Sequence, residues 1–458
     1  MNTETVILAS ASSEITNEYI SVFWITLVAL LSPLAAALTK KKIPDVVFLI
    51  AFGILIGPNI FHLADPEGGV ELIKELGLGV LFLLAGYEIN TSRLKSRQGG
   101  SALLVWLVCF GLGILCAGLV AGFSKPFTSL VAVGLALSST ALGTLLPMLK
   151  NNGASGTKVG DAFMLHGAIG EVMPIFAMAL LLSTHSPFMA VAILLLFMVI
   201  AVISAIIPHR AFEHIPGLRR VMAAEANTTS QTMLRFAMFL LAGLMMAAAV
   251  FELDVVLGAF SAGIILRSLT PNGAVEPFTK RLEVLGFSFL IPLFFVCSGM
   301  GINITVVSEK PLTLIMILVG ILLIRGLPVF LAEQFTNTDS GLETVNEKVQ
   351  LALYSSAGLP IIVAVTQVAI SHGLISEDIA SLLLTGGAVT VLLFPIWAAT
   401  INKLFPAHSD EGDSEQDSAQ EEAPKTAQER KSEKKSERAQ MMKAHTGMIS
   451  VVKAQQKK

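Results

Sequence analysis

The sequence LHGAIGEVMP, residues 165–174, places a single carboxylate in the middle of a long apolar run from about Lys158 to Ser183. If this run is a membrane helix, Glu171 lies roughly 20 Å along it, close to the middle of the bilayer. A charged side chain at that depth is unfavourable by at least a few kcal/mol unless it is paired, hydrated or protonated. We therefore take Glu171 as a candidate ion site. The alternative is a protonated Glu that makes only structural hydrogen bonds.

The composition of the chain is that of a membrane protein with many spans. Of its 458 residues, 53% are hydrophobic and 14% are charged, whereas soluble domains carry about 25% charged residues. The net charge of −3 indicates no particular partner, because the charges lie in the loops and the tail. Residues 1–17 lack the basic region that begins a signal peptide, so we expect no cleaved leader. The cysteines lie in apolar runs and are expected to be core residues: Cys109, Cys116 and Cys297.

Thirteen apolar segments have the length of a membrane helix, with boundaries good to a few residues. In chain order they are 19–38, 44–62, 72–90, 101–123, 127–150, 158–183, 187–207, 231–250, 254–269, 284–302, 311–333, 348–371 and 378–403. Several contain Gly or Pro, which membrane helices tolerate. The predicted fold class is an all-α polytopic membrane protein with 13 transmembrane helices.

The basic residues of the loops predict the orientation of the chain. Short loops rich in Lys and Arg stay in the cytoplasm. Most of these residues follow odd-numbered segments, in the ranges 40–42, 93–97, 150–158, 210–220 and 267–281. Those that follow even-numbered segments are only Lys74, Lys125 and Lys310. We therefore expect a chain in the inner (plasma) membrane, surrounded by lipid, with its N-terminus outside and its C-terminus in the cytoplasm.

The predicted organisation has three parts: an extracytoplasmic segment at residues 1–18, a transmembrane domain at 19–403 and a disordered cytoplasmic tail at 404–458. The tail is acidic from Ser409 to Glu422 and rich in Lys and Gln from Lys425 to Lys458, with almost no aliphatic residues to form a core. It has no Gly-rich strand–turn–helix signature, so we expect no nucleotide-binding domain and no nucleic-acid partner. A basic helical end at the membrane surface is the alternative for this tail.

Two similar passages indicate an internal repeat. They read ALSSTALGTLLP (residues 136–147) and ALYSSAGLP (residues 352–360), and each places a cluster of Ser, Thr and Gly inside an apolar span. The passages lie seven segments apart, so their helices cross the membrane in opposite directions. This predicts inverted six-helix repeats with two broken helices, whose freed carbonyls and helix dipoles face the membrane centre. The alternative is that the small residues only permit close helix packing.

A buried arginine is predicted in the eleventh segment. Arg325 lies about fourteen residues into this segment, in the sequence ILLIRGLP (residues 321–328), and so also near the middle of the bilayer. Arginine stays charged in proteins, so it must face protein or water and find acceptors. Its candidate partners are Glu171, the carbonyl end of a broken helix and Glu333. A structural ion pair or a helix cap is the alternative to a role in an ion site.

Four passages carry a resemblance to a known family. They are GVLFLLAGYEI (79–89), ALSSTA (136–141), LGAFSAG (257–263) and PLFFVCSGM (292–300). In this order they resemble the monovalent cation:proton antiporter superfamily, in the branch that contains the bacterial NapA and Kef transporters. The resemblance implies a NhaA/NapA-like fold, a homodimer, and an elevator mechanism in which the broken helices cross at the ion site. The moving core would take helices from about 72–183 in part and from 284–403, and a scaffold domain the remainder.

The chain departs from this family at the site helix. Many relatives carry an Asp-Asp pair there and Kef-type members carry Gln-Asp, whereas this chain has Gly170-Glu171. The ion-binding carboxylate is kept, one methylene longer, and the first acid is lost. Arg325 stands where the two-aspartate members have Lys. One site carboxylate beside an Arg resembles the electroneutral members more than the electrogenic ones.

These observations predict one set of site residues. Glu171 is expected to bind the cation or the proton with the hydroxyls of Ser138, Ser139 and Thr140, and Glu171 and Thr140 are the predicted ligands of Na⁺ or K⁺. Hard cations prefer oxygen ligands, and a proton on Glu171 removes the charge that attracts the cation, so the two compete. The predicted supporting residues are Arg325, His166, Gly170, Ser355, Ser356 and Gly358.

The predicted function is exchange of a monovalent cation, Na⁺ before K⁺, for protons. It needs no cofactor and no enzyme chemistry, and the sequence shows no nucleophile–base pair or metal-ligand spacing. One alternative is a sodium-coupled symporter of an organic anion that uses Arg325 to hold a carboxylate. Another is a ligand-gated potassium efflux channel, against which the lack of a nucleotide-binding signature counts. His166 is a candidate proton relay or pH sensor, and a neutral, packed histidine is the alternative.

Overall fold

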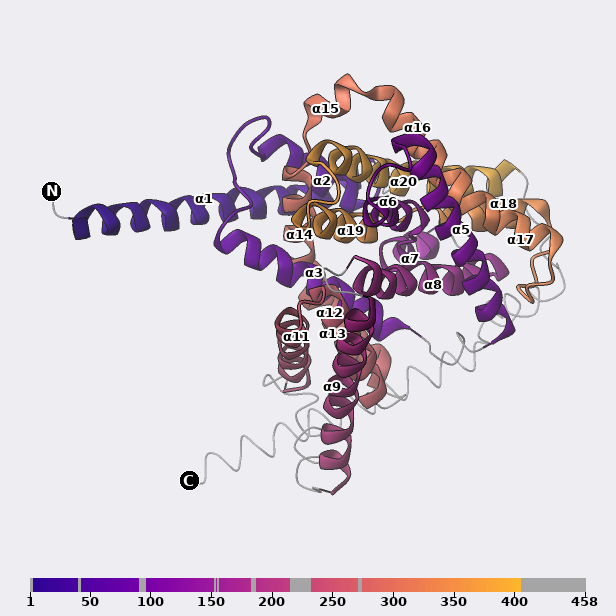
Figure 1. The fold of residues 1–458 in the computed structure, drawn as a ribbon, viewed down its shortest axis with the longest axis horizontal. Coiled ribbons are helices and arrows are strands. Elements are labelled where there is room, and N and C mark those ends of the chain that lie inside the picture. Colours follow the sequence, from indigo (N-terminus) through magenta and orange to yellow (C-terminus); the bar gives the residue numbers. More distant parts are fainter. Residues whose placement is uncertain are drawn as a thin grey trace, which may run out of the picture. The chain divides into compact units, whose positions relative to one another are not determined.

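The computed structural model describes residues 3–39, 43–89, 96–151, 154, 156–182, 187–214, 232–270 and 274–404. These residues lie in one compact unit, Met1–Phe405, and the described part of the chain is helical throughout, with short connections (Figure 1). The tail predicted at 404–458 falls outside the described residues, apart from Leu404 at the end of the last helix.

Each of the thirteen predicted segments coincides with a helix or with consecutive helices. Nine described segments are long and apolar enough to cross a membrane, and three more apolar helices are shorter. The first helix, α1 (Thr3–Leu38), also includes most of the segment predicted to precede the membrane, because no Gly or Pro interrupts residues 3–18. The chain is thus a multi-pass membrane protein, while the count of thirteen crossings and the inverted repeat stay predictions.

The helices pack in two groups, each with most of its contacts inside the group. The first group contains α1, α2 (Asp45–Ile56), α3 (Gly69–Glu88), α11 (Thr232–Val250), α12 (Val255–Leu269), α13 (Val275–Leu285), a π-helical turn (Gly286–Leu290) and α14 (Ile291–Met300). The second contains α5 (Arg97–Ala121), α6 (Phe127–Ser138), α7 (Leu142–Asn151), α8 (Lys158–Leu181), α16 (Pro311–Ile321), a π-helical turn η3 (Leu322–Gly326), α17 (Leu327–Phe335), α18 (Val345–Ser355), α19 (Leu359–Ser371) and α20 (Glu377–Leu404).

Two helices lie between or beside these groups. The long helix α9 (Pro187–His214) contacts α8 in the second group and α12 in the first, which fits its place as the seventh predicted segment, between the two halves of the chain. The short α15 (Ile304–Glu309) precedes α16 and contacts α20. The chain thus passes from the second group back to the first through α9, and from the first to the second after α3 and again after α14.

Glycines set the close contact between α3 and α12 in the first group. A Cβ on Gly86 would overlap the carbonyl of Phe260, and a Cβ on Gly263 would overlap the carbonyl of Leu83. The two glycines therefore bring the two backbones together from both sides, as small residues do in membrane helix pairs. Gly86 and Gly263 belong to two of the passages that carry the family resemblance, so those passages contribute packing rather than ion ligands.

Both broken helices are present. The first is interrupted between Ser138, where α6 ends, and Leu142, where α7 begins; the second is interrupted between Ser355 and Leu359. Ser139 has an extended backbone, with φ −79° and ψ 158°. A helix that is interrupted in this way frees carbonyl groups at one end and N–H groups at the other. In a membrane these groups must be satisfied by protein or by a hydrated cavity.

We expect Gly263→Ala to destabilise the protein, because the added methyl group meets the carbonyl of Leu83 and neither helix can move aside alone. Overpacking of this kind costs about 1–3 kcal/mol. Gly243→Ala in α11 is the matched control, since a Cβ there meets no described atom within 4 Å. Thermal unfolding in detergent should show a lower melting temperature for Gly263→Ala only. An equal change in both variants would contradict the packing interpretation.

Candidate ion-binding site

The two helix breaks contact each other directly through their backbones. The amide of Ala141 donates to the carbonyl of Ala357 at 2.7 Å. The hydroxyl of Ser139 donates mainly to the carbonyl of Ala136 in its own helix, at 2.9 Å, and the carbonyl of Gly358 lies within reach as a second, weaker acceptor at 3.3 Å. A Cβ on Gly358 would overlap the side chain and backbone of Ser139. Glycine at position 358 thus allows the breaks to approach, and each break satisfies part of the other's freed backbone.

Thr140 connects the crossing to two further helices. Its amide donates to the carbonyl of Gly170 in α8 at 3.0 Å. Its hydroxyl donates to the carbonyl of Ser355 at 2.5 Å and accepts a hydrogen bond from Nε of Arg325 at 3.0 Å. A hydroxyl that has given its proton to a carbonyl and holds a guanidinium is a poor ligand for a cation, because the positive charge repels a second one. Thr140 therefore organises the site.

Glu171 is buried beside the crossing, with 3% of its surface exposed. The backbone N–H of Leu142 faces its carboxylate, and Leu142 begins α7, so the carboxylate lies at the positive end of a half-helix dipole. Its Oε2 has no hydrogen-bond partner among the described residues. Glu88, at the end of α3, lies within Coulombic range from the other helix group. One oxygen of a buried acid is thus left available to a proton or a cation.

Arg325 is fully buried in the π-helical turn η3, and it is held without a carboxylate. Its Nη2 donates to the carbonyl of His166 at 2.9 Å and its Nη1 to the thiol of Cys109 at 3.7 Å, in addition to the bond with Thr140. Among the described residues no ion pair joins it to Glu171 or Glu333, the two acids considered from the sequence. The sequence analysis also considered the carbonyl end of a broken helix as a partner of Arg325. The carbonyl that accepts from Arg325 is instead that of His166, in the interior of α8.

Gly170 lies directly against Thr140 and Arg325, where a side chain does not fit. A Cβ at this position would lie 2.5 Å from Oγ1 of Thr140 and 2.6 Å from Nη2 of Arg325. The space that a carboxylate side chain would fill is therefore occupied by the guanidinium itself. Glycine at position 170 and arginine at position 325 depend on each other. Because Gly170 has no side chain, the long side chain of Arg325 reaches the carbonyl of His166 in α8.

The remaining hydroxyl residues predicted for the site differ in whether their hydroxyl groups already have a hydrogen-bond partner. The hydroxyls of Ser138 and Ser356 bond to carbonyls of their own helices. Oγ of Ser355 is buried without a described partner, and so is Oγ1 of Thr144, which the sequence analysis did not select. Thr144 lies one half-turn into α7 from Leu142, in the same run of small and hydroxyl residues. That run was the signal by which it could have been found.

A cavity of about 990 Å³ is lined by helices of both groups. Its lining includes Met178 of α8, about 10 Å along the helix from Glu171 at 1.5 Å per residue. Most of its charged lining residues are acidic: Asp65, Glu67, Glu71, Glu75, Glu252, Asp254 and Glu377, with Lys74 among them. Burial raises the pKa of the Asp254 carboxyl to about 6. An acidic cleft of this kind concentrates cations.

The comparison with protein families identifies the chain. A family model described as the transmembrane sodium/hydrogen exchanger matches residues 26–403. The chain belongs to this family. The model covers both helix breaks, Glu171 and Arg325, so the whole candidate site lies inside the family's own region.

Named relatives are similar over the same region. YjbQ of Bacillus subtilis, named as a candidate Na⁺/H⁺ antiporter, is 25% identical over 325 residues, 67% of this chain and 51% of YjbQ. The glutathione-regulated potassium-efflux system protein KefC of Escherichia coli is 27% identical over 306 residues, 65% of this chain and 47% of KefC. The chain thus spans about half the length of these relatives. The structure of the sodium proton antiporter MjNhaP1 from Methanocaldococcus jannaschii has the same fold, with a TM-score of 0.60 and 19% identity over 84% of this chain and 97% of that one.

We expect Thr140→Val to destabilise the protein, because it leaves the carbonyl of Ser355 and one N–H of Arg325 without a partner. Each unsatisfied buried group costs about 1–3 kcal/mol. Thr390→Val is the matched control: Thr390 is fully buried, but its hydroxyl bonds only within its own helix, to Gly387. Melting temperatures in detergent should fall clearly further for Thr140→Val. Similar losses in the two variants would show that Thr140 does not join the helices energetically.

Proposed function

We propose that this protein is a secondary active transporter that exchanges a monovalent cation for protons, with both competing for Glu171. The observation that carries this proposal is the buried carboxylate with one oxygen left without a described partner, beside a crossing of two interrupted helices. Family membership supports the same activity, and so does the name of YjbQ, while the name of KefC supports transport of a monovalent cation.

The competition follows from the cost of burying charge. A bare carboxylate in a low-dielectric site is unfavourable, and either a proton or a cation removes the net charge. Freed carbonyls at the ends of α6 and α18 and the hydroxyl of Ser355 are suitable further oxygen ligands for Na⁺ or K⁺. The site then has two loaded states and one costly empty state, and this couples the two fluxes.

The cavity supports access from one side. Its acidic residues lie near the N-terminal ends of α3, α12 and α20, which the distribution of loop charges predicts to be outside the cytoplasm. In the proposed orientation the cavity is an extracytoplasmic entrance, and Met178 and Ala179 of α8 are part of its lining. Helices from both groups line it, so movement of one group against the other would change its shape.

We further propose an electroneutral elevator mechanism in a homodimer. The moving core is α5–α8 with α16–α20, and the scaffold is the first helix group. This core is narrower than the one inferred from the sequence, because α3 and α14 pack with α2 and α12. A single site carboxylate supports a one-for-one exchange, since Arg325 makes its bonds to neutral groups and keeps its charge in both loaded states.

For the transported cation we take Na⁺ first and K⁺ second. The family description and YjbQ's name refer to sodium, whereas KefC's name refers to potassium. The organic-anion alternative loses its support, because Arg325 is fully buried and its side chain is held by Thr140, His166 and Cys109. Proton flux driven by sodium and by potassium gradients in proteoliposomes, each at two membrane potentials, identifies both the cation and the electrogenicity.

We expect Glu171→Gln to abolish cation-driven proton flux in proteoliposomes, because the amide neither ionises nor exchanges a proton for a metal ion. Glu343→Gln is the matched control. Glu343 is exposed and pairs with Lys158 at 2.8 Å, and its loss should leave the flux within about twofold of the unchanged protein, since exposed ion pairs contribute little. Undiminished exchange in Glu171→Gln would rule out this residue as the site of competition.

A further inference from the structure

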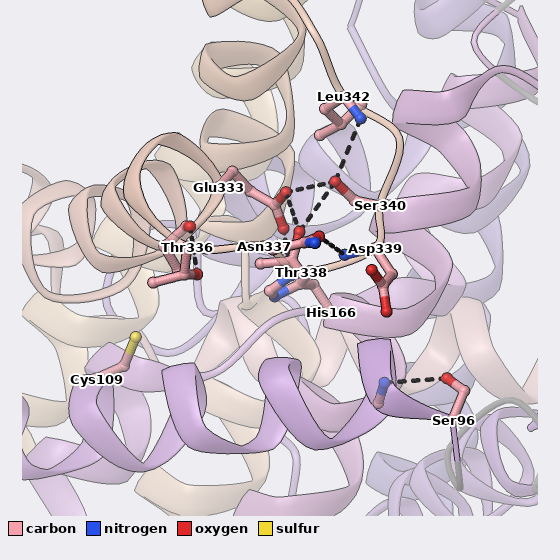
Figure 2. Close-up of polar contacts among 12 residues, drawn as sticks. Ser96, Cys109, His166, Glu333, Thr336, Asn337, Thr338, Asp339, Ser340 and Leu342 are labelled. Carbon is pink, nitrogen blue, oxygen red and sulfur yellow. Dashed lines mark hydrogen bonds and ion pairs between the residues drawn. The ribbon is translucent and has the colours of Figure 1, made fainter.

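The thiol of Cys109 in α5 contacts both the backbone and the side chain of Arg325. Its Sγ lies 3.8 Å from the carbonyl oxygen of Arg325, as a donor, and accepts from Nη1 of the same residue at 3.7 Å. Cys109 is fully buried, and Figure 2 shows its sulfur pointing away from the α5 ribbon. One small side chain thus fixes the guanidinium relative to its own backbone. The proposed exchange at Glu171 gives this contact no role.

The thiol is the weakest of the three contacts that hold the guanidinium. Nε donates to the hydroxyl of Thr140 at 3.0 Å and Nη2 to the carbonyl of His166 at 2.9 Å, which are ordinary hydrogen-bond lengths. A thiol sulfur is a weak acceptor by comparison. In the described part of the chain it is nevertheless the hydrogen-bond partner of Nη1, so Cys109 holds the one corner of the guanidinium that the helix break and α8 do not.

Without the thiol, Nη1 would need another acceptor. A charged donor that is buried without a partner is strongly unfavourable. Within the described ranges, two buried carboxylate oxygens have no hydrogen-bond partner: Oε2 of Glu171 and Oε1 of Glu333. These two acids are therefore the candidates to which a released guanidinium would turn.

Glu333 is already engaged by other groups. Its Oε2 accepts from the hydroxyls of Thr338 and Ser340, and Figure 2 shows both bonds. Its Oε1 lies 3.4 Å from Nε2 of His166, and both side chains of this His166–Glu333 pair are only 1% exposed. The hydroxyls and the imidazole therefore surround this carboxylate, and it has little need of Arg325.

Glu171 is the acid that Arg325 can reach with the smallest change. The guanidinium already lies against Gly170, the residue before Glu171, since a Cβ on Gly170 would be 2.6 Å from Nη2. Hydrogen-bonded pairs of arginine and carboxylate are among the strongest polar contacts in proteins. Such a pair would take the oxygen that the cation and the proton compete for.

We propose that Cys109 is a positioning residue that keeps Arg325 away from Glu171 and thereby sets the affinity of the site for its cation. The inference rests on the proposed exchange function. A thiol fits this role because it is neutral, so it holds the guanidinium without cancelling its charge. A sulfur also does not attract Na⁺ or K⁺, which prefer oxygen ligands, so Cys109 does not compete with Glu171 for the cation.

The test compares two variants of nearly equal size in proteoliposomes. Cys109→Ala removes the acceptor and should raise the apparent KM for the cation about tenfold, the factor expected when one hydrogen bond to a charged group competes with cation binding. The kcat should stay within about twofold, because the lost interaction affects binding. Cys109→Ser keeps an acceptor and a donor, so it should bring KM back to within about threefold of the unchanged protein.

Two further variants separate this role from packing. Cys109→Val fills the space of the thiol but offers no acceptor, so it should raise KM as Cys109→Ala does. Cys116→Ala, two turns farther along α5 at a half-buried position, should leave KM unchanged. An unchanged KM in Cys109→Ala and Cys109→Val would overturn the proposal, and so would a Cys109→Ser variant as impaired as Cys109→Ala.

A measurement without transport distinguishes this proposal from the proposed function. In a cryo-electron microscopy structure of full-length Cys109→Ala without added Na⁺ or K⁺, Nη1 of Arg325 should lie within hydrogen-bond distance of the Glu171 carboxylate. A guanidinium that stays in place, or that turns to Glu333, overturns the positioning role whatever the flux shows. A guanidinium that moves to Glu171, in a protein whose unchanged form shows no cation-driven proton flux, supports that role and contradicts the exchange function.

Discussion

A helix that stops inside a membrane must find partners for the backbone groups it frees, and here two such helices satisfy each other. The bond from Ala141 to Ala357 and the contact of Ser139 with Gly358 join the two breaks directly. In hydrocarbon an unpaired amide or carbonyl costs several kcal/mol. The breaks can therefore persist only together, and the positions of the neighbouring helices follow from this constraint.

Arg325 shows how the rest of the site is arranged around the crossing. A guanidinium cannot lose its charge in a protein, and its neighbours here are a hydroxyl, a carbonyl and a thiol rather than an acid. A carboxylate partner would have neutralised the arginine but would also have been unavailable to a cation. Because neutral acceptors hold Arg325, one oxygen of Glu171 is left without a partner in the described part of the chain. The absence of a side chain at Gly170 leaves the space that the guanidinium of Arg325 occupies.

The sequence predicted the helices and their breaks well, because both depend on local features. Apolar runs of membrane length, and clusters of Ser, Thr and Gly inside two of them, located α6–α7 and α18–α19 to within a few residues. Partners could not be predicted in the same way. Nothing near Arg325 in the chain indicates Cys109 or the carbonyl of His166, and Thr140 was expected to bind a cation because sequence shows a hydroxyl but not the groups that already use it.

The location of the polar contacts within one helix group bears on how the site could move. The bonds of the crossing, of Arg325 and of the His166–Glu333 pair all join elements of the second group, from α5 to α19. The first group contacts it through a few helix pairs, across the cavity and by the approach of Glu88 to Glu171. In the proposed elevator mechanism, these polar contacts would travel together with the second group. Glu88 on α3 would stay behind, and this would change the field at Glu171.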